Sequence, residues 1–455
     1  ERTIATIHPN DTWEKIVLNP WSQVSWDVND TVLRDPRTDE DVGGYVRPYL
    51  DREHSQKGGW KSWYAQRVEG ALGTLEQKAA QKSAAHADTP ARVWFDSLGR
   101  SVRAVAHNRL SRRNEVVDEH YAVRTTLDIE GNQREVVDGL GRTVMRYAYD
   151  MQGNALYQAS MDSATRWTLN DVGNSSIYIW NSRGYRIHME YDRLRRPLRQ
   201  WVRGIDSQDL LAERTVYGET HPDAAKLNIR GKSYYQFDGA GAVRHDRYDF
   251  KGNLLRSTRR ISREYRAQPT WATVESHLNA EQLDVPALET ILETLLQVEA
   301  WSGETAYDAN NRPSAVTSPD GSTAFLRYNE ANLLEQLDVR FSTSDRQTPI
   351  IKGVDYDARG QRREIEFGNG TKTRHAYDPL TFRLSRLQTV RGNEALQDLH
   401  YVYDPAANIT SIEDSVHPHV YFKNAVVAAS TDYEYDAVYQ LIEAAGREHI
   451  GQAPA

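Results

Sequence analysis

The stretch YDARGQRREIEFGNGTKTRHAYDPLTFRLSRLQTV, residues 356–390, decides the fold. It contains Tyr-Asp twice, and a short polar turn and a strand-like run follow each copy. In these runs the apolar residues recur at every second position, which is the side-chain period of a β-strand. The pair Asn369-Gly370 between them is typical of a two-residue hairpin turn, because Asn and Gly tolerate positive φ. The stretch therefore predicts antiparallel strands, with Tyr-Asp as a candidate repeat marker.

The same unit recurs along the chain. It consists of an aromatic residue, an acid, about three residues that usually include Gly or Asn, and a strand. Looser copies carry Phe, Leu, Trp or Val at the first position, or Asn at the second, as in Phe95-Asp96 and Trp180-Asn181. The spacing of about ten to twelve or twenty to thirty residues fits one strand or one hairpin. The clear copies are Tyr149-Asp150, Tyr191-Asp192, Tyr248-Asp249, Tyr307-Asp308, Tyr356-Asp357, Tyr377-Asp378, Tyr403-Asp404 and Tyr435-Asp436.

The substitutions inside the unit indicate what each position needs. Because several apolar residues replace Tyr, we expect the first position to require apolar bulk rather than a phenol proton. Because Asn replaces Asp, the second position requires a short acceptor, which closes an Asx-turn by accepting from the N–H two residues on. A catalytic pair would occur once, whereas this pair occurs about fifteen times. We therefore interpret Tyr-Asp as a structural unit.

The composition narrows the classes of function. The 455 residues carry a net charge of −8, with basic residues spread evenly, which argues against a nucleic-acid partner. The chain contains no long apolar run, so membrane insertion is not expected. Cys is absent, which excludes disulfides and thiolate metal sites. The start without Met, in a strand-like segment, favours an internal fragment.

Two segments interrupt the strand pattern and are predicted to be helical insertions. Residues 263–300 carry Pro286 at a helix start and a mostly helical apolar stripe. Residues 59–86 are rich in Ala, Gln, Lys and Glu. Residues 34–44 read as an acidic loop. The rest of 1–455 is predicted to be one repeat-based β domain, with further hairpin turns at Pro9-Asn10-Asp11 and Asp320-Gly321.

Three groups of residues in the sequence are candidates for chemical sites. Six acidic residues between Asp27 and Asp41 lack the ligand spacing of a calcium loop, so a solvated turn is favoured. His417 and His419 have no third metal ligand nearby. Glu364 and Glu366 lie two apart on one predicted strand and could suggest a glycosidase pair, but an exposed hairpin usually leaves such residues solvated. No catalytic, cofactor or metal site is predicted.

Several longer motifs resemble the RHS or YD-repeat family. They include DIEGNQREVVDGLGRTVMRYAYDMQGN (128–154), YNEANLLE (328–335) and YEYDAVYQLIEAAGREHIGQ (433–452). The ordered set is similar to the shell-forming region of toxin-complex B/C-type insecticidal toxins, over essentially the whole chain. The resemblance implies a long antiparallel sheet that spirals into a hollow shell, or cocoon, around a cytotoxic C-terminal cargo. It also implies secretion, and as partners the remaining shell segments with their core-associated domain, the enclosed cargo and a pore-forming translocation subunit.

The sequence departs from the family's pattern in two respects, and two other functions remain as hypotheses. The family's core-associated segment, which has aspartyl self-cleavage activity, would follow residue 455. In YDPAAN, Ala407 replaces the usual Gly, which puts the turn type at that repeat in doubt. An extracellular glycan- or receptor-binding module of the adhesion type is the alternative function, since Tyr and Trp rings stack on sugars. A carbohydrate-active enzyme is a third hypothesis.

Overall fold

The protein consists mainly of antiparallel β-strands. The computed structural model describes residues 3–55, 59–112, 115–267, 269, 271–278, 282–422 and 425–447. Within these ranges 29 strands belong to one hydrogen-bonded sheet, and β28 and β29 form a separate pair. The predicted fold class, mainly β with a long antiparallel sheet, is confirmed. The chain divides into two compact units, unit 1 (1–144, 355–366 and 370–455) and unit 2 (145–354 and 367–369).

Unit 1 contains two runs of strands that pair with their neighbours in chain order. β1 to β7 form one run, and β23 to β27 followed by β30 and β31 form the other. The strands are β1 (Ala5–Ile7), β2 (Trp13–Leu18), β3 (Ser22–Trp26), β4 (Ala91–Phe95), β5 (Ser101–Arg112), β6 (Glu115–Leu127), β7 (Gln133–Val137), β23 (Arg362–Phe367), β24 (Thr371–Tyr377), β25 (Leu384–Arg391), β26 (Glu394–Tyr403), β27 (Ile409–Asp414), β28 (Val420–Phe422), β29 (Ala425–Val427), β30 (Ser430–Tyr435) and β31 (Leu441–Ala445).

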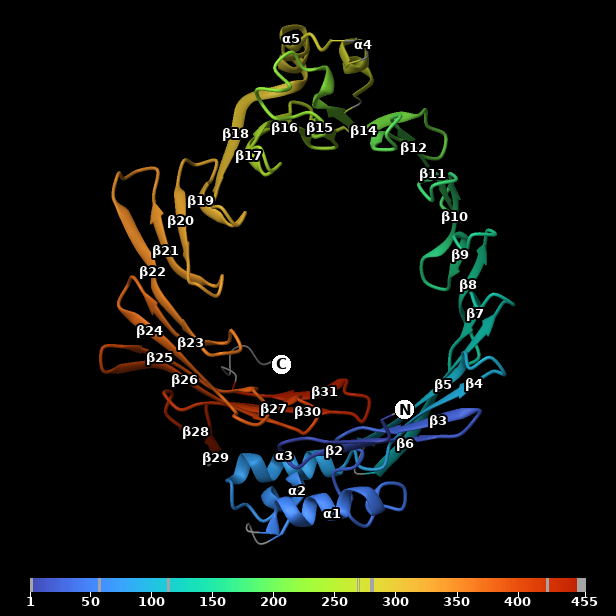
Figure 1. Ribbon diagram of the computed structural model, residues 1–455, viewed down its shortest axis with the longest axis vertical. Helices are drawn as coiled ribbons and strands as arrows, with labels where there is room; N and C mark the ends of the chain where they lie inside the picture. The colour runs from blue at the N-terminus through green and yellow to red at the C-terminus, as the bar shows by residue number, and fades with distance from the viewer. Residues whose placement is uncertain are drawn as a thin grey trace. The chain divides into compact units, whose positions relative to one another are not determined.

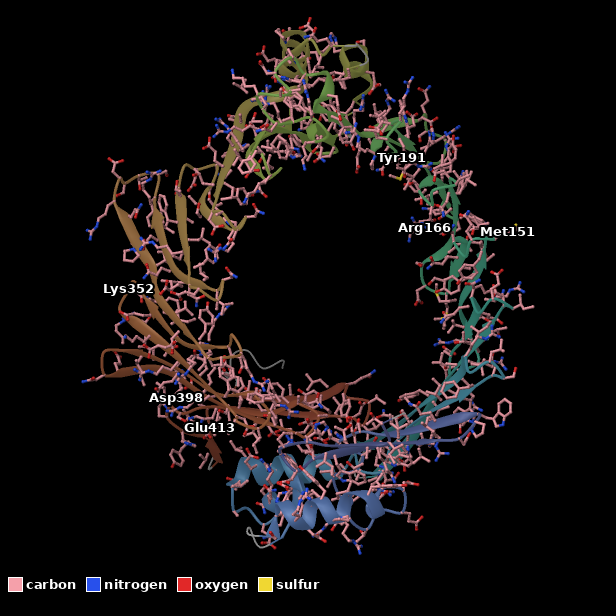
Figure 2. All side chains as sticks on the ribbon, in the orientation of Figure 1. Met151, Arg166, Tyr191, Lys352, Asp398 and Glu413 are labelled. Atoms are coloured by element: carbon pink, nitrogen blue, oxygen red, sulfur yellow. The ribbon has the colours of Figure 1, made fainter. Side chains whose placement is uncertain are left out.

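Unit 2 is a single meander in which each strand from β8 to β22 pairs with the next. Its strands are β8 (Thr143–Tyr149), β9 (Ala155–Ser160), β10 (Ala164–Asn170), β11 (Ser176–Asn181), β12 (Arg186–Tyr191), β13 (Pro197–Arg203), β14 (Leu210–Tyr217), β15 (Ser233–Asp238), β16 (Gly241–Tyr248), β17 (Leu254–Ser262), β18 (Leu296–Tyr307), β19 (Pro313–Thr317), β20 (Thr323–Tyr328), β21 (Leu334–Arg340) and β22 (Gln347–Tyr356). Figure 2 shows side chains on both faces of these strands, and most are only partly buried.

The three predicted hairpin turns are confirmed. The strand ends flanking them pair as Ile7 with Trp13, Thr317 with Thr323 and Glu366 with Lys372. At the last turn, however, Gly370 adopts a φ of 84°, whereas Asn369 does not have the positive φ expected from the dipeptide. The expectation of two left-handed residues is therefore wrong there.

The helices of unit 1 differ from the predicted insertion. The segment 59–86 forms two helices, α2 (Trp63–Arg67) and α3 (Thr74–Ala84), because Gly70 and Gly73 between them adopt positive φ. A further helix, α1 (Gly43–Glu53), lies beside them and was not predicted (Figure 1). It contains Pro48 and has no side-chain cap at Val42, so it lacks the usual start signal.

The helices of unit 2 lie within the predicted insertion, but the last one ends earlier than expected. They are η3 (Trp271–Val274), α4 (Glu275–Leu278) and α5 (Val285–Leu295), and a short η2 (Gly218–Thr220) lies upstream. Asp284 caps α5 by accepting from the Ala287 N–H at 3.0 Å. The expected helix up to residue 300 is wrong, because β18 begins at Leu296 and pairs with β17. Sheet pairing overrides the helical stripe at that point.

In each unit, helices cover only part of the sheet. In unit 2, η3, α4 and α5 bury a core with β14 to β17 that includes Phe237, Trp271, Leu288 and Leu292. In unit 1, α2 and α3 form a smaller cluster around Trp63 that reaches β26. None of the helices in the described ranges has the length and apolar character needed to cross a bilayer. Elsewhere, the turns and backbone pairing hold the strands together.

Candidate functional site

The repeated acid closes a compact turn between two strands. At Asp150 one carboxylate oxygen accepts from the N–H groups of Gln152 at 2.8 Å and Asn154 at 2.9 Å. The second oxygen accepts from the Asn154 side-chain amide at 3.0 Å. Gly153 takes the left-handed conformation with a φ of 82°. The bond from the Gln152 N–H is the Asx-turn bond that the sequence predicts. The second backbone bond, from the Asn154 N–H, was not predicted.

Other repeats close their turns in the same way. At Asp378 the turn is one residue longer, and the carboxylate accepts from Leu380 and Thr381 instead. Asn181 and Asn329 replace Asp and still accept from the N–H groups two and four residues on. The turn thus uses an acceptor oxygen, and the negative charge is not required for these bonds. Donors two and four residues on also serve Asp192, Asp249, Asp308, Asp357 and Asp436.

Ala407 keeps the turn type that its substitution put in doubt. Its φ is 81°, close to that of the usual glycine, and its N–H donates to the Asp404 carbonyl at 3.2 Å. The Asp404 N–H in turn donates to the Asn408 carbonyl at 2.9 Å. An alanine in this region costs more than a glycine, because its Cβ approaches the following carbonyl. The repeat therefore tolerates strain at one position without changing its geometry.

The phenol of the repeat makes a recurring hydrogen bond. Seven tyrosines at the ends of strands donate from their hydroxyls, at 2.8 to 3.1 Å, to the carbonyl of the first residue of the neighbouring, earlier strand. The expectation that the first repeat position needs only apolar bulk is wrong for six of these tyrosines, whereas the seventh, Tyr217, precedes Gly218 and lies outside the repeat. We call these bonds tyrosine locks. They join Tyr191 to Ser176, Tyr217 to Pro197, Tyr248 to Ser233, Tyr328 to Pro313, Tyr377 to Arg362, Tyr403 to Leu384 and Tyr435 to Ile409.

The locks of unit 2 and most of its Asx-turns lie at one edge of its sheet, whereas the Asn181 turn lies at the other. In an antiparallel meander every second connection lies at the same edge, and these Asx-turns occupy such alternate connections. The other edge carries the helical insertion between β17 and β18. Arg312 links successive turns, because it donates to the Asn332 side-chain oxygen at 2.7 Å and lies 4.5 Å from the Tyr328 ring centroid. The turns on this edge are centred on Asp150, Asp171, Asp192, Asp249, Asp308 and Asn329.

Hydrogen bonding in the turns favours the ionised form of the acids. The Asn154 side-chain amide, followed by the Asn154 backbone N–H, lowers the pKa of Asp150. The backbone N–H of Arg312 is the main cause of the lowered pKa of Asp308. At Asp192 burial opposes ionisation, but hydrogen bonds from Arg196 outweigh it and the pKa is also lowered. These groups therefore lack the raised pKa of a general acid at neutral pH.

Contacts between distant parts of unit 1 are a feature that the sequence analysis missed. The Asn29 amide donates to Asp404 at 3.0 Å, and the Asn108 amide donates to Asp436 at 3.0 Å. The Tyr439 hydroxyl donates to Asp27 at 2.5 Å. These partners are more than 300 residues apart in the chain. No local pattern marks Asn29 or Asn108, so the sequence held no signal for this seam.

The acidic stretch from Asp27 to Asp41 is not the solvated turn that was expected. The buried Lys15 ammonium lies 2.7 Å from the carboxylate of Asp39, which is also buried, and 2.8 Å from that of Asp41. Asp30 is buried and accepts from the N–H and hydroxyl of Thr89. Burial and then the neighbouring Asp27 raise the pKa of Asp30 to about 6. The prediction failed because β2 supplies a buried cation that complements these acids.

The other residues considered for chemistry do not form a reactive pair in the described ranges. Glu364 accepts from Arg374 at 2.8 Å, and this bond is the main cause of its lowered pKa. Glu366 lies 3.0 Å from Lys372, which also approaches Glu364. His417 lies 3.6 Å from Asp414 and is largely exposed. Ion pairing of this kind suits a wet sheet surface rather than acid–base catalysis.

Comparison with known proteins identifies relatives of the chain. No family model matches it. Toxin subunit YenC2 of Yersinia entomophaga is 28% identical over 395 residues, and toxin subunit YenC1 of the same organism is 24% identical over 384. The chain is a homologue of these toxin subunits. Each alignment covers 80% of the chain, but only 39% and 38% of the relatives, so the chain spans about two fifths of their length.

Solved structures share the fold of this chain. A TcdB2-TccC3 crystal structure without the hypervariable C-terminal region matches all of the chain with a TM-score of 0.78. The Tc holotoxin pore of Photorhabdus luminescens matches 98% of it with a TM-score of 0.77. Both are 22% identical, and the chain covers 19% of each matched chain. The predicted resemblance to the shell region of toxin-complex proteins is confirmed.

Proposed function

We propose that residues 1–455 form a structural shell segment of a secreted toxin complex, which encloses a cytotoxic C-terminal cargo for delivery. The observation that carries the proposal is the fold match over the whole chain to TcdB2-TccC3 without its hypervariable C-terminal region. Homology to two toxin subunits supports the same assignment. The repeated acids and tyrosines then act as the turn unit of the shell wall.

The composition of the sheet suits a wall that touches a cargo without holding it tightly. Large apolar faces would bind unfolded protein, whereas these strands present mixed charges on partly wet faces. Glu364, Glu366, Lys372 and Arg374, for example, neutralise each other on neighbouring strands. At these two strands the surface offers a passing polypeptide paired rather than free charges.

The proposed role requires partner proteins and involves no catalysis by this segment. The segment works with the remaining shell segments, the enclosed cargo and a pore-forming translocation subunit. It contributes no cofactor or metal chemistry and no catalysis of its own, since the turn acids are held ionised and the paired glutamates are neutralised. Secretion follows from the toxin role.

Protease protection of the natural full-length polypeptide that carries this chain tests enclosure. Limited proteolysis should leave the sequence C-terminal to the shell intact under native conditions, and should cleave it once urea opens the wall. A matched control is the same C-terminal sequence expressed alone, which should be cleaved at once. Equal cleavage of enclosed and isolated C-terminal sequence would contradict the proposal.

A further inference from the structure

One face of unit 1 carries a pocket that the shell role does not require. It has a volume of about 570 Å³ and lies over β3 to β6. A volume of this size suits a small ligand of a few rings. The lining combines indole, imidazole, guanidinium and carboxylate groups, among them those of Trp26, Asp88, Trp94, Arg103, His107 and His120.

Sheet pairing aligns these groups across neighbouring strands. Trp94 on β4 pairs with Arg103 on β5, and Arg103 pairs with Arg124 on β6. The guanidinium carbon of Arg103 lies 5.0 Å from the Trp94 ring centroid. Further along β5 and β6, His107 and His120 stack with their ring centroids 4.3 Å apart. The pocket therefore has flat aromatic walls beside a row of guanidinium groups.

The positive charge of this row is not neutralised within the described ranges. Arg92, Arg103 and Arg124 are exposed, and none of them pairs with a carboxylate of a described residue. By contrast, Arg34 at the rim lies 2.6 Å from Asp88. Arg103 and Arg124 face each other directly, and like charges in that position destabilise a sheet. A bound anion would remove this repulsion.

We propose that this pocket binds an acidic glycan, through a saccharide that carries a carboxylate. The guanidinium group of Arg103, which lines the pocket, and that of Arg124, which lies beside it on β6 and outside the lining, receive the carboxylate, since Arg suits planar two-oxygen recognition. Arg103 lies over one face of the Trp94 ring and Lys15 over one face of the Trp26 ring, and the solvent-accessible parts of both indoles receive the C–H face of a sugar ring. The Asp88 carboxylate accepts from ring hydroxyls. This inference goes beyond the shell role and does not depend on it.

The mixed lining favours a sugar acid over other anions. A multiply charged phosphate would meet the Asp88 carboxylate at close range, and repulsion would oppose binding. An acidic peptide would use the arginines but leave the indole faces of Trp26 and Trp94 without a matching apolar ring surface. A sugar with one carboxylate and several hydroxyls uses all three kinds of group.

Calorimetric titration of the 455-residue chain tests the proposal. The probe is a tetrasaccharide of alternating glucuronic acid and N-acetylglucosamine, and its neutral counterpart is the N-acetylglucosamine tetramer. The acidic probe should bind and quench tryptophan fluorescence, and its affinity should fall with added salt. The neutral tetramer should bind at least about tenfold more weakly, because the charge-assisted contact is lost.

Matched variants separate the pocket from general surface charge. Arg103→Gln and Trp94→Ala should each weaken binding by about tenfold. Arg134→Gln is the control, because Arg134 is exposed on β7 and does not line the pocket. An unchanged far-UV circular dichroism spectrum establishes that each variant is folded. Equal effects of Arg103→Gln and Arg134→Gln, or equally tight binding of hexaglutamate, would overturn the proposal.

Discussion

Replacing Asp404 by Ala should be more damaging than the same change at most of the repeat turns. Its carboxylate accepts from the Asn408 N–H and side-chain amide, each at 2.8 Å, and from Asn29 at 3.0 Å. Asn29 is fully buried, and its own side-chain oxygen has no partner among the described residues. Losing a turn bond costs about 1 kcal/mol, and stranding a buried amide adds about 2 kcal/mol. We expect the free energy of unfolding to fall by about 3 kcal/mol.

Asp404→Asn is the matched variant, and it should cost less than about 1 kcal/mol. The new side-chain oxygen still accepts from Asn408, and the Asn29 amide can rotate so that its free oxygen accepts from the new amide. Equilibrium unfolding in urea, followed by tryptophan fluorescence, measures both variants, provided that the slope m stays constant. Asp357→Ala, at a turn without such a partner, should cost about 1 kcal/mol. Equal losses for the Ala and Asn variants at position 404 would refute the reasoning, because charge rather than acceptor geometry would then matter.

Four further outcomes are expected. Tyr403→Phe should lower the free energy of unfolding by about 1 kcal/mol in urea, since it removes the 2.8 Å lock to Leu384, and a neutral result would restore the apolar-bulk interpretation. Ala407→Gly should stabilise by about 0.5 to 1 kcal/mol, because glycine adopts the φ of 81° without strain, and a loss of stability would contradict this. The pKa of Asp30 is raised from 3.8 to about 6, so the folded chain binds its proton more tightly than the unfolded chain. The stability of the wild type relative to Asp30→Asn should therefore rise by up to about 3 kcal/mol as the pH falls from about 7 to 4, and a flat difference would argue against it. The purified chain should remain one band on a denaturing gel between about pH 4 and 8, and internal cleavage that Glu364→Gln abolishes would show catalysis.

The repeat made much of the fold predictable, because its signals are local. Turn chemistry at Asp150 or Gly321 depends on a few adjacent residues, so the strands and hairpins could be placed from the sequence. The tyrosine locks could also have been suspected, since Tyr outnumbers Phe at the first position when clear and looser copies are taken together. A preference for Tyr over Phe indicates that the hydroxyl has a partner.

The remaining features depend on contacts between distant residues. The seam between Asn29 and Asp404 joins residues 375 apart, and neither residue looks unusual among its neighbours. The stripe of α5 continued past Leu295, but the partner strand β17 decided where the helix stops. Likewise, nothing in the sequence around Asp39 indicates that the Lys15 ammonium lies beside its carboxylate. Pairing partners of this kind are set by the sheet, and no local pattern reports them.

The position of the tyrosine locks in unit 2 bears on where related chains can gain or lose residues. Residues added between β17 and β18, at the unlocked edge, leave every lock in place and keep the strands on either side in phase. The segment between β14 and β15 (218–232) is also long and lies at the locked edge, yet Tyr217 before it keeps its lock to Pro197, because the lock joins the tyrosine to the preceding strand and not across the turn that follows. Length should therefore drift at the connections of both edges without breaking a lock. Alignments that keep each locked strand pair intact and allow gaps only at the connections should recover the correspondence of repeats where overall identity has fallen to 22%.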